Sequence, residues 1–361
     1  MQRSAGINAL AQVQHCPINS QVMNCLKSGL QALQIAGISL QSRAFLAPMS
    51  GVTDIVMRRL AARYGAGIVV SEMIASDELV RGSEEARIRA EGQGVSPHVV
   101  QLAGCDPHWL GEAARLAEAN GAAIVDINMG CPAKKVTGGW AGSALMRDLD
   151  HAVRLVEAAV AAVTIPVTVK MRLGWDDASR NAPELAARAV AAGARMITVH
   201  GRTRQQFYKG TADWRAIAAV RAAGDFPLVA NGDIADASDA RRCLAQSGAD
   251  FVMVGRAALG CPWLAGEIGA ALDEKPFARP SLSDKLAVAT EHYEGLLALM
   301  GTAHGVRHAR KHLAAYADEA LAEGCEPDAE RRRVLLTSDE PRRVTEALAG
   351  LFSTDGSRRA A

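Results

Sequence analysis

Short apolar runs recur along the first three quarters of the chain, each followed by a polar or glycine-rich stretch and then by an Ala-, Leu- and Arg-rich stretch with helical spacing. The runs cover Ala44–Ala47, Gly67–Ser71, His98–Leu102, Ala123–Ile127, Val167–Met171, Met196–Val199, Pro227–Ala230 and Phe251–Val254. Helices are predicted between them, for example over Trp109–Asn120, His151–Val163, Pro183–Ala192, Trp214–Ala222 and Ala237–Gln246. The runs are continuously hydrophobic, which is typical of parallel strands covered on both faces.

Strands that alternate with helices in this way predict an α/β fold, and closing the eight strands into a ring gives a (β/α)8 TIM barrel. The span from about residue 40 to 270 matches the usual size of such a barrel. An open doubly wound sheet is the alternative, but no G-x-G-x-x-G follows the first strand.

The pattern changes on both sides of the barrel. Glu274–Ser283 contains two prolines and reads as a linker, and a small all-helical domain is predicted beyond it. Its amphipathic helices are expected over Leu286–Met300, Val306–Leu321 and Val344–Phe352. At the other end, residues 1–34 are expected to be a disordered extension, and a short hairpin from Ile35 to Leu40 leads into the first strand. The expected domains are therefore 1–34, 35–275 and 276–361.

Composition adds few constraints. Lys and Arg total 40 against 39 for Asp and Glu, so a nucleic-acid partner would have to be met by a local basic patch. The seven cysteines are scattered without a CxxC pair or zinc-ligand spacing, which predicts reduced thiols and no metal site. No apolar segment reaches membrane-spanning length. We expect a cytoplasmic monomer.

Each apolar run ends in a distinctive residue. These ends are Pro48 with Met49, Glu72, Gln101, Asn128 with Cys131, Lys170, His200, Asn231 with Gly232 and Asp233, and Gly255 with Arg256. Taken singly, Gln101, Lys170 or His200 is more often a structural residue than a ligand contact. In a barrel, however, all of them converge on the C-terminal rim, where such enzymes keep their active sites.

The ends of the last two strands suggest the ligand. Barrels often hold a phosphate there, with backbone N–H groups, glycine clearance and a cation such as Arg256. Lys170 could stabilise negative charge, and Gln101 could hydrogen-bond a flat polar ring. Flavin mononucleotide (FMN) fits this description.

Cys131 stands where the fourth run gives way to a glycine-rich loop that also carries Lys134 and Lys135. A thiol in such a place can deliver a proton or act as a nucleophile, and the lysines would favour an anionic ligand. Buried free cysteine is common, so simple packing explains Cys131 about equally well from the local sequence.

Several segments together resemble the tRNA-dihydrouridine synthases, most closely the bacterial B-type branch. The matching segments are 47–54 (APMSGVTD), 71–73 (SEM), 126–136 (DINMGCPAKKV), 169–172 (VKMR), 198–204 (TVHGRTR), 230–234 (ANGDI), 255–257 (GRA) and 310–312 (RKH). The resemblance extends from about Ile35 to Tyr316.

The resemblance implies a role for each matching residue. Pro48, Met49 and Ser50 would back the flavin, and Asn128 would lie beside flavin and target base. Gln101, Lys170 and His200 would line the ring and ribityl side. Asn231, Gly232, Asp233, Gly255 and Arg256 would hold the phosphate end. Cys131 matches the general acid of the family, and NADPH, with NADH as the alternative, would be the electron donor.

Reduction of the uracil C5–C6 bond needs a hydride at C6, which reduced FMN can give, and a proton at C5, which a thiol can supply near neutral pH. The base must leave the RNA stack to be reached. The predicted RNA contacts are Lys134, Lys135, Arg202, Arg204, Arg307, Arg310 and Lys311. A solvated helix face explains the basic residues of the helical domain as readily. By resemblance, the target is the tRNA D-loop, at position 17.

Three other functions fit parts of the sequence. A barrel similar to dihydroorotate dehydrogenase would also pair FMN with a loop cysteine and a pyrimidine, but the helical domain has no purpose for so small a substrate. An aldolase-type barrel would use Lys170 as a Schiff base. A catalytically silent RNA-binding protein is the third alternative, although no core motif is missing.

Overall fold

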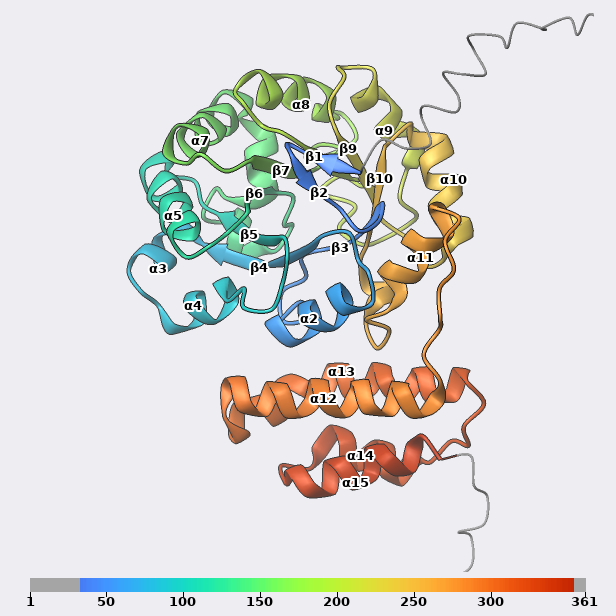
Figure 1. Ribbon diagram of the computed structural model, residues 1–361. Helices are drawn as coiled ribbons and strands as arrows, with labels where there is room; N and C mark the ends of the chain where they lie inside the picture. Colours follow the sequence, from blue (N-terminus) through green and yellow to red (C-terminus); the bar gives the residue numbers. More distant parts are fainter. Residues whose placement is uncertain (1–32, 354–361) are drawn as a thin grey trace, which may run out of the picture. The chain divides into compact units, whose positions relative to one another are not determined.

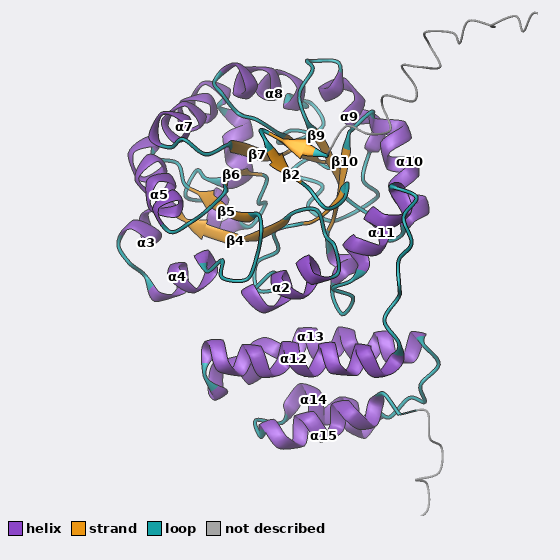
Figure 2. Ribbon diagram, viewed as in Figure 1, coloured by secondary structure: helices purple, strands orange, loops and turns teal. Residues whose placement is uncertain are grey.

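Eight parallel strands close into a barrel in the computed structural model of the chain, which describes residues 33–353 (Figures 1 and 2). They are β3 (Ala44–Leu46), β4 (Val69–Ala75), β5 (His98–Ala103), β6 (Ile124–Met129), β7 (Val167–Arg172), β8 (Ile197–His200), β9 (Leu228–Asn231) and β10 (Phe251–Val254). Pairing of β10 with β3 closes the ring. The predicted (β/α)8 barrel is confirmed.

The strands are apolar throughout because both of their faces are covered. All residues of β5 and β6 are buried, and their register places Val99 opposite Ile124. Phe45 and Phe251 stack with ring centroids 5.1 Å apart across the closing pair. Side chains thus fill the barrel interior, while helices cover the outside (Figure 1).

The barrel helices are α2 (Ile55–Arg63), α3 (Ser76–Val80), α4 (Glu84–Ala90), α5 (Pro107–Ala119), α6 (Lys134–Thr137), α7 (Leu149–Ala162), α8 (Ala182–Ala191), α9 (Trp214–Arg221), α10 (Ala237–Ser247) and α11 (Leu264–Leu272). Aspartates cap several of them: Asp54, Asp106, Asp148, Asp213 and Asp236 accept first-turn amide hydrogens. These caps fix the residues at which the loops of the C-terminal rim end and the helices begin.

The C-terminal helices are α12 (Leu282–Met300), α13 (Thr302–Ala322), α14 (Ala329–Thr337) and α15 (Pro341–Leu351). A Ser281–Asp284 capping box starts α12 near the predicted position. The sequence did not predict α14, because only Leu335 is buried in it and no apolar stripe marks it as a helix.

A hairpin of β1 (Gln34–Ile35) and β2 (Ile38–Ser39) precedes the barrel, as predicted. Its turn residues Ala36 and Gly37 have φ of 49° and 84°, as a tight two-residue turn requires. The described residues from Gln34 to Ser353 form one compact unit, so the boundary at 275/276 stays a prediction. The expected extension, apart from its last residues, lies outside the described residues. None of the described helices is both long and apolar enough to cross a membrane.

Candidate active site

A cavity of about 850 Å³ opens at the C-terminal end of the barrel. Cys131 and every residue predicted to hold the cofactor line this cavity: Pro48, Met49, Ser50, Gln101, Asn128, Lys170, His200, Asn231, Gly232, Asp233, Gly255 and Arg256. The predicted convergence is therefore present, while the role of each residue stays a prediction. Glu72 lies behind the wall, where it accepts the backbone N–H of Gly51 at 2.6 Å.

A buried chain of hydrogen bonds orients the amide side chains of the cavity. Gln101 Nε2 donates to Asp126 Oδ2 at 2.7 Å, and Gln101 Oε1 accepts from Asn128 Nδ2 at 2.7 Å. Thr168 Oγ1 donates to the other oxygen of Asp126 at 2.6 Å. Each amide keeps a second N–H for a ligand. Burial raises the pKa of Asp126, while the hydrogen bonds from Gln101 and Thr168 lower it.

The same series of hydrogen-bonded side chains also holds the loop that carries Cys131. Asn128 Oδ1 accepts the backbone N–H groups of Gly130 and Cys131 at 3.1 and 2.9 Å. Ser143 donates to the Cys131 carbonyl from its backbone N–H and its hydroxyl, at 3.0 and 2.8 Å. Gly142, at φ +60°, leaves room for this carbonyl, because a Cβ there would come within 2.8 Å of it. Cys131 is half-buried at the cavity wall and not part of the core.

Lys170 contributes a cation to the cavity with little compensation from the protein. Its Nζ donates to Asn231 Oδ1 at 3.1 Å. Burial and the charge of Arg172 lower the pKa of Lys170 to about 8, although Asp126 and Cys131 act in the opposite direction. An anionic group in the cavity would therefore stabilise the ammonium form.

His200 is held as a neutral imidazole. Burial, followed by the positive charges of Lys170 and Arg172, lowers its pKa well below the ordinary value. Its Nε2 lies 3.3 Å from the guanidinium of Arg202, which can only donate. Nε2 is therefore an acceptor, and Nδ1 carries the proton.

Asp233 and Arg202 form an ion pair at the far end of the cavity, with N–O distances of 2.5 and 3.0 Å. Burial would raise the pKa of Asp233, but the hydrogen bonds from Arg202 and the Ala212 N–H, with the charges of Arg202 and Arg256, together hold it below its usual value. Gly232, at φ +120°, packs against His200, and a Cβ at Gly255 would meet nothing within 4 Å. This leaves an open glycine-lined end beside the exposed guanidinium of Arg256.

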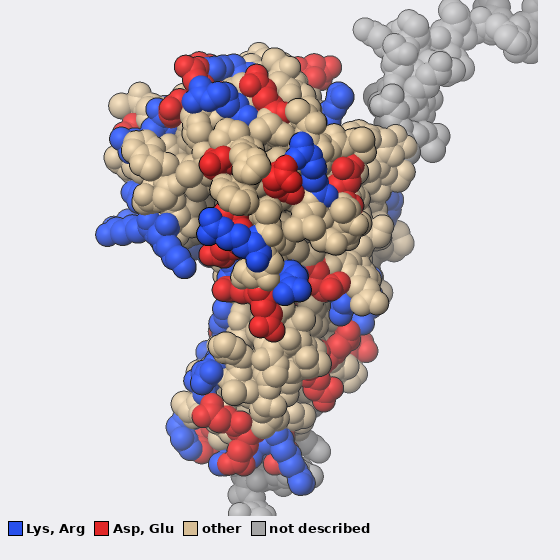
Figure 3. Space-filling model, turned by 90° about the vertical axis from the view of Figure 1, so that its left-hand side faces the viewer, with Lys and Arg blue, Asp and Glu red and all other residues tan. Residues whose placement is uncertain are grey.

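The residues predicted to contact RNA are dispersed. Arg202 is only 1% exposed and forms an ion pair with Asp233, so its predicted RNA contact stays a prediction that the observed burial does not favour. Arg310 pairs with Asp339 at 2.9 Å, and Arg204 lies over the Trp175 ring, 4.7 Å from its centroid. Arg307, Lys311 and the α6 lysines Lys134 and Lys135 are exposed. Figure 3 shows positive and negative side chains mixed over one face.

Sequence reasoning missed two aromatic residues at the cavity, Phe207 and Tyr208, which are 44% and 46% exposed. The guanidinium carbons of Arg172 and Arg256 lie 5.5 and 5.2 Å from the centroid of the Tyr208 ring. The motif HGRTR pointed to this loop, but an exposed aromatic residue cannot be told from a core one by its type alone.

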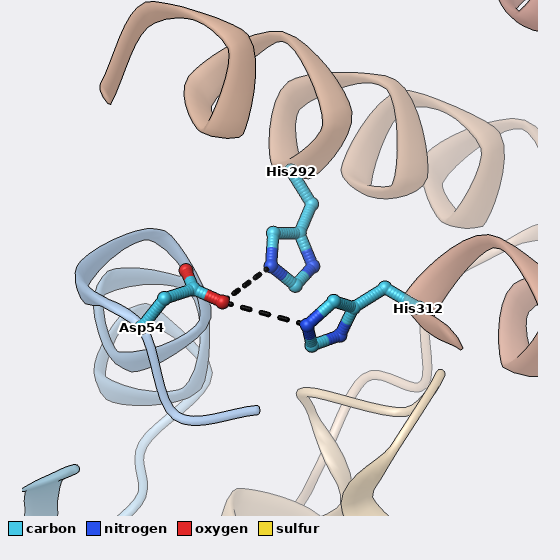
Figure 4. A group of neighbouring side chains, drawn as sticks. All are labelled: Asp54, His292 and His312. Carbon is cyan, nitrogen blue, oxygen red and sulfur yellow. Dashed lines mark hydrogen bonds and ion pairs between the residues drawn. The ribbon is translucent and has the colours of Figure 1, made fainter. Parts of the chain in front are cut away.

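A buried polar cluster joins α12 and α13 to the loop that lines the cavity (Figure 4). Asp54 Oδ2 lies 3.2 Å from His292 Nε2 and 3.5 Å from His312 Nε2, and His292 Nδ1 lies 3.0 Å from the Tyr316 hydroxyl. Burial would raise the pKa of Asp54, but His292 and His312 together lower it well below its usual range. Asp54 thus connects the helical region to the cavity loop.

The ligand atoms of Asp54, His292 and His312 lie within 4.8 Å of one another, so these residues could hold a metal ion. Structural zinc sites have four protein ligands, one more than this cluster offers. The expected absence of a metal stays a prediction.

Comparison with known proteins shows the family to which the chain that carries this site is similar. The family model for dihydrouridine synthases (Dus) matches residues 45–350. A probable tRNA-dihydrouridine synthase from Rhizobium leguminosarum bv. phaseoli is 53% identical over 86% of this chain and 95% of its own length. The tRNA-dihydrouridine synthase B of Xanthomonas axonopodis pv. citri is 46% identical over 80% of this chain and 87% of its own.

Solved structures show the fold at much lower similarity. A 2-naphthoyl-CoA reductase in complex with 2-naphthoyl-CoA aligns with a TM-score of 0.53 at 14% identity, over 68% of this chain and 52% of its own. The family match covers the barrel and most of the helical region, and it agrees with the predicted B-type resemblance. The chain belongs to the tRNA-dihydrouridine synthase family, whose members are oxidoreductases.

Proposed function

We propose that this protein reduces a uridine in the D-loop of tRNA to 5,6-dihydrouridine, with FMN in the barrel cavity and NADPH as the electron donor. One observation carries the proposal: a reachable thiol, Cys131, and a cation, Lys170, line the same cavity, which ends in a glycine-lined recess beside Arg256.

The donor groups of the cavity fit FMN. Gln101 and Asn128 each keep an amide N–H, and Lys170 keeps N–H groups that the protein does not use, so a flat ring with carbonyl groups would be hydrogen-bonded. Pro48, Met49 and Ser50 would back the ring. Asn231, Gly232, Gly255 and Arg256 would hold the phosphate, and Arg202 neutralises the one carboxylate that would repel it, that of Asp233.

When bound and reduced, FMN would supply the hydride that adds to C6 of the uracil ring. The Cys131 thiol then gives its proton to C5, so that the double bond gains two hydrogen atoms in total. The bonds from Asn128 and Ser143 hold the loop in place while the thiol acts.

The substrate must place one base in the cavity, which requires the base to leave its stack. Lys134 and Lys135 stand on the loop that carries Cys131, where they can contact phosphates beside the extruded nucleotide. We assign tRNA binding to residues 276–361 as well, through Arg307 and Lys311. Position 17 is the expected target, and the protein acts as a cytoplasmic monomer.

Replacing Cys131 tests the proposal. We expect Cys131→Ala to keep its flavin but to form dihydrouridine at least about 100-fold more slowly, the usual contribution of a positioned acid. The measurement is mass spectrometry of dihydrouridine in tRNA after single-turnover reaction, together with the flavin spectrum. Cys105→Ala is the matched control, since Cys105 is also a half-buried free thiol but does not line the cavity. Full turnover in Cys131→Ala would remove the acid role.

A further inference from the structure

Trp140 is the most exposed of the large apolar side chains in the described part of the chain, at 58%. It lies nine residues after Cys131, between α6 and the 3₁₀ helix η2 (Gly142–Arg147), with φ +58°. A large exposed aromatic ring in a strained backbone position calls for an explanation, because neither packing nor the proposed chemistry uses it.

The ring belongs to a stack of alternating aromatic and arginine side chains. The guanidinium carbon of Arg147 lies 5.3 Å from the Trp140 ring centroid and 4.9 Å from that of Trp175. The guanidinium carbon of Arg204 also lies over Trp175, 4.7 Å from its ring centroid. These distances are those of cation–π contacts. The four side chains come from the segments that follow β6, β7 and β8, so the stack crosses three neighbouring rim loops.

The stack is joined to the cavity at both ends. At one end, η2 contains Ser143, which binds the Cys131 carbonyl. At the other, the backbone N–H of Phe207 donates to the Arg204 carbonyl at 3.1 Å, and Phe207 lines the cavity. Trp140 is therefore held at a set position relative to the thiol.

The surroundings favour a base over a phosphate at this ring. A groove beside Trp140 and Arg147 is also lined by Asp148, Asp150, Glu184 and Arg188, and Arg188 forms ion pairs with Asp150 and Glu184. Three carboxylates thus face two guanidinium groups, which leaves no surplus of positive charge to attract a phosphate. The nearby Lys134 and Lys135 are exposed and suit the RNA backbone. Stacking on an aromatic ring is open to every base, since each has a π face.

We propose that Trp140, supported by Arg147, is a stacking platform for the nucleobase next to the extruded uridine. This inference rests on the proposed function. Extrusion of one base leaves the face of its neighbour uncovered, which costs stacking energy, and the Trp140 ring covers that face. Arg147 and Trp175 are positioning residues that hold the ring.

The test compares Trp140→Phe, which keeps a stacking ring, with Trp140→Leu, which keeps apolar area only. We expect Phe to stay within about threefold of wild type, and Leu to weaken tRNA binding and to raise the KM for tRNA about tenfold or more. The kcat should change little. Trp109→Leu is the control, because Trp109 has its own arginine partner, Arg81, at 5.3 Å but does not line the cavity or the groove.

Binding is measured by fluorescence anisotropy of labelled tRNA on the flavin-loaded protein, so the test does not depend on turnover. Equal affinities for Phe, Leu and wild type would overturn the platform. So would an equal loss in Phe and Leu accompanied by a lower melting temperature, since that would indicate a purely structural contact. A wild-type protein that makes no dihydrouridine overturns the proposed function instead, and the comparison of affinities still decides on the platform.

Discussion

At the scale of single residues, the geometry of the site depends on groups that do not themselves line the cavity. Asp126 is buried and does not line the cavity, yet it fixes which way the Gln101 amide faces and, through Gln101 and Asn128, where the Cys131 loop lies. Asp126 belongs to a motif visible in the sequence, but its role was not predicted. A sequence shows which residue ends a strand, and not which side chain lies behind it.

We expect Asp126→Asn to lower kcat about tenfold while the protein keeps its flavin, because the new amide can turn an N–H toward Gln101 and reverse its orientation. Single-turnover rates and flavin content measure the two effects separately. Thr168→Val is the matched variant, since its hydroxyl binds the other carboxylate oxygen. If Asp126→Asn turns over as fast as wild type, the hydrogen bond between Asp126 and Gln101 is not needed for catalysis.

At the scale of elements, buried parallel strands leave continuous apolar runs, so the strand ends could be predicted to within two residues. The exception is the end of β4, which extends to Ala75 where Ser71 was predicted. Phe251–Val254 was predicted without error. Helix α14 could not be predicted, because it buries only Leu335 and its sequence has no periodic apolar stripe. Long-range pairings were equally hidden. Asp54 and His312 both belong to recognised motifs, but nothing in the sequence says that they meet.

The Asp54–His292–His312 cluster predicts a pH dependence of stability. Burial, then the charge of His292, lowers the pKa of His312 well below 6.5, with His308 and Lys311 acting the same way and Asp54 opposing. Below pH 6.5 the unfolded chain therefore binds a proton that the folded chain excludes, and stability falls as the pH drops. One such group contributes about 1.4 kcal/mol between pH 7.5 and 5.5.

The measurement is urea unfolding of wild type and His312→Asn at these two pH values. Other histidines with lowered pKa values, such as His98 and His200, add to the wild-type slope, so the difference between the two proteins carries the result. His312→Asn should lose about 1.4 kcal/mol less than wild type. Equal losses would contradict the assignment. EDTA should change neither curve if the cluster holds no metal.

At the scale of the whole molecule, near-neutral charge forces RNA binding to rely on a few unpaired cations. Most arginines outside the barrel are paired, as Arg332 is with Asp318 and Arg333 with Glu330. Among the described residues, Lys134, Lys135 and Arg307 have no ion-pair partner and are exposed. These were predicted from sequence together with Arg310, because charge is visible in a sequence and pairing is not.

Salt dependence separates the unpaired cations from the paired ones. Each phosphate contact contributes roughly 0.7 to 0.9 to the slope of log affinity against log salt. Lys135→Ala should therefore reduce the slope for tRNA by about that amount. Arg310→Ala should leave the slope unchanged, because Asp339 already neutralises that guanidinium and no counterion is released when RNA binds. Equal slopes for the two variants would mean that the pairing in the free protein does not decide which cations meet the RNA.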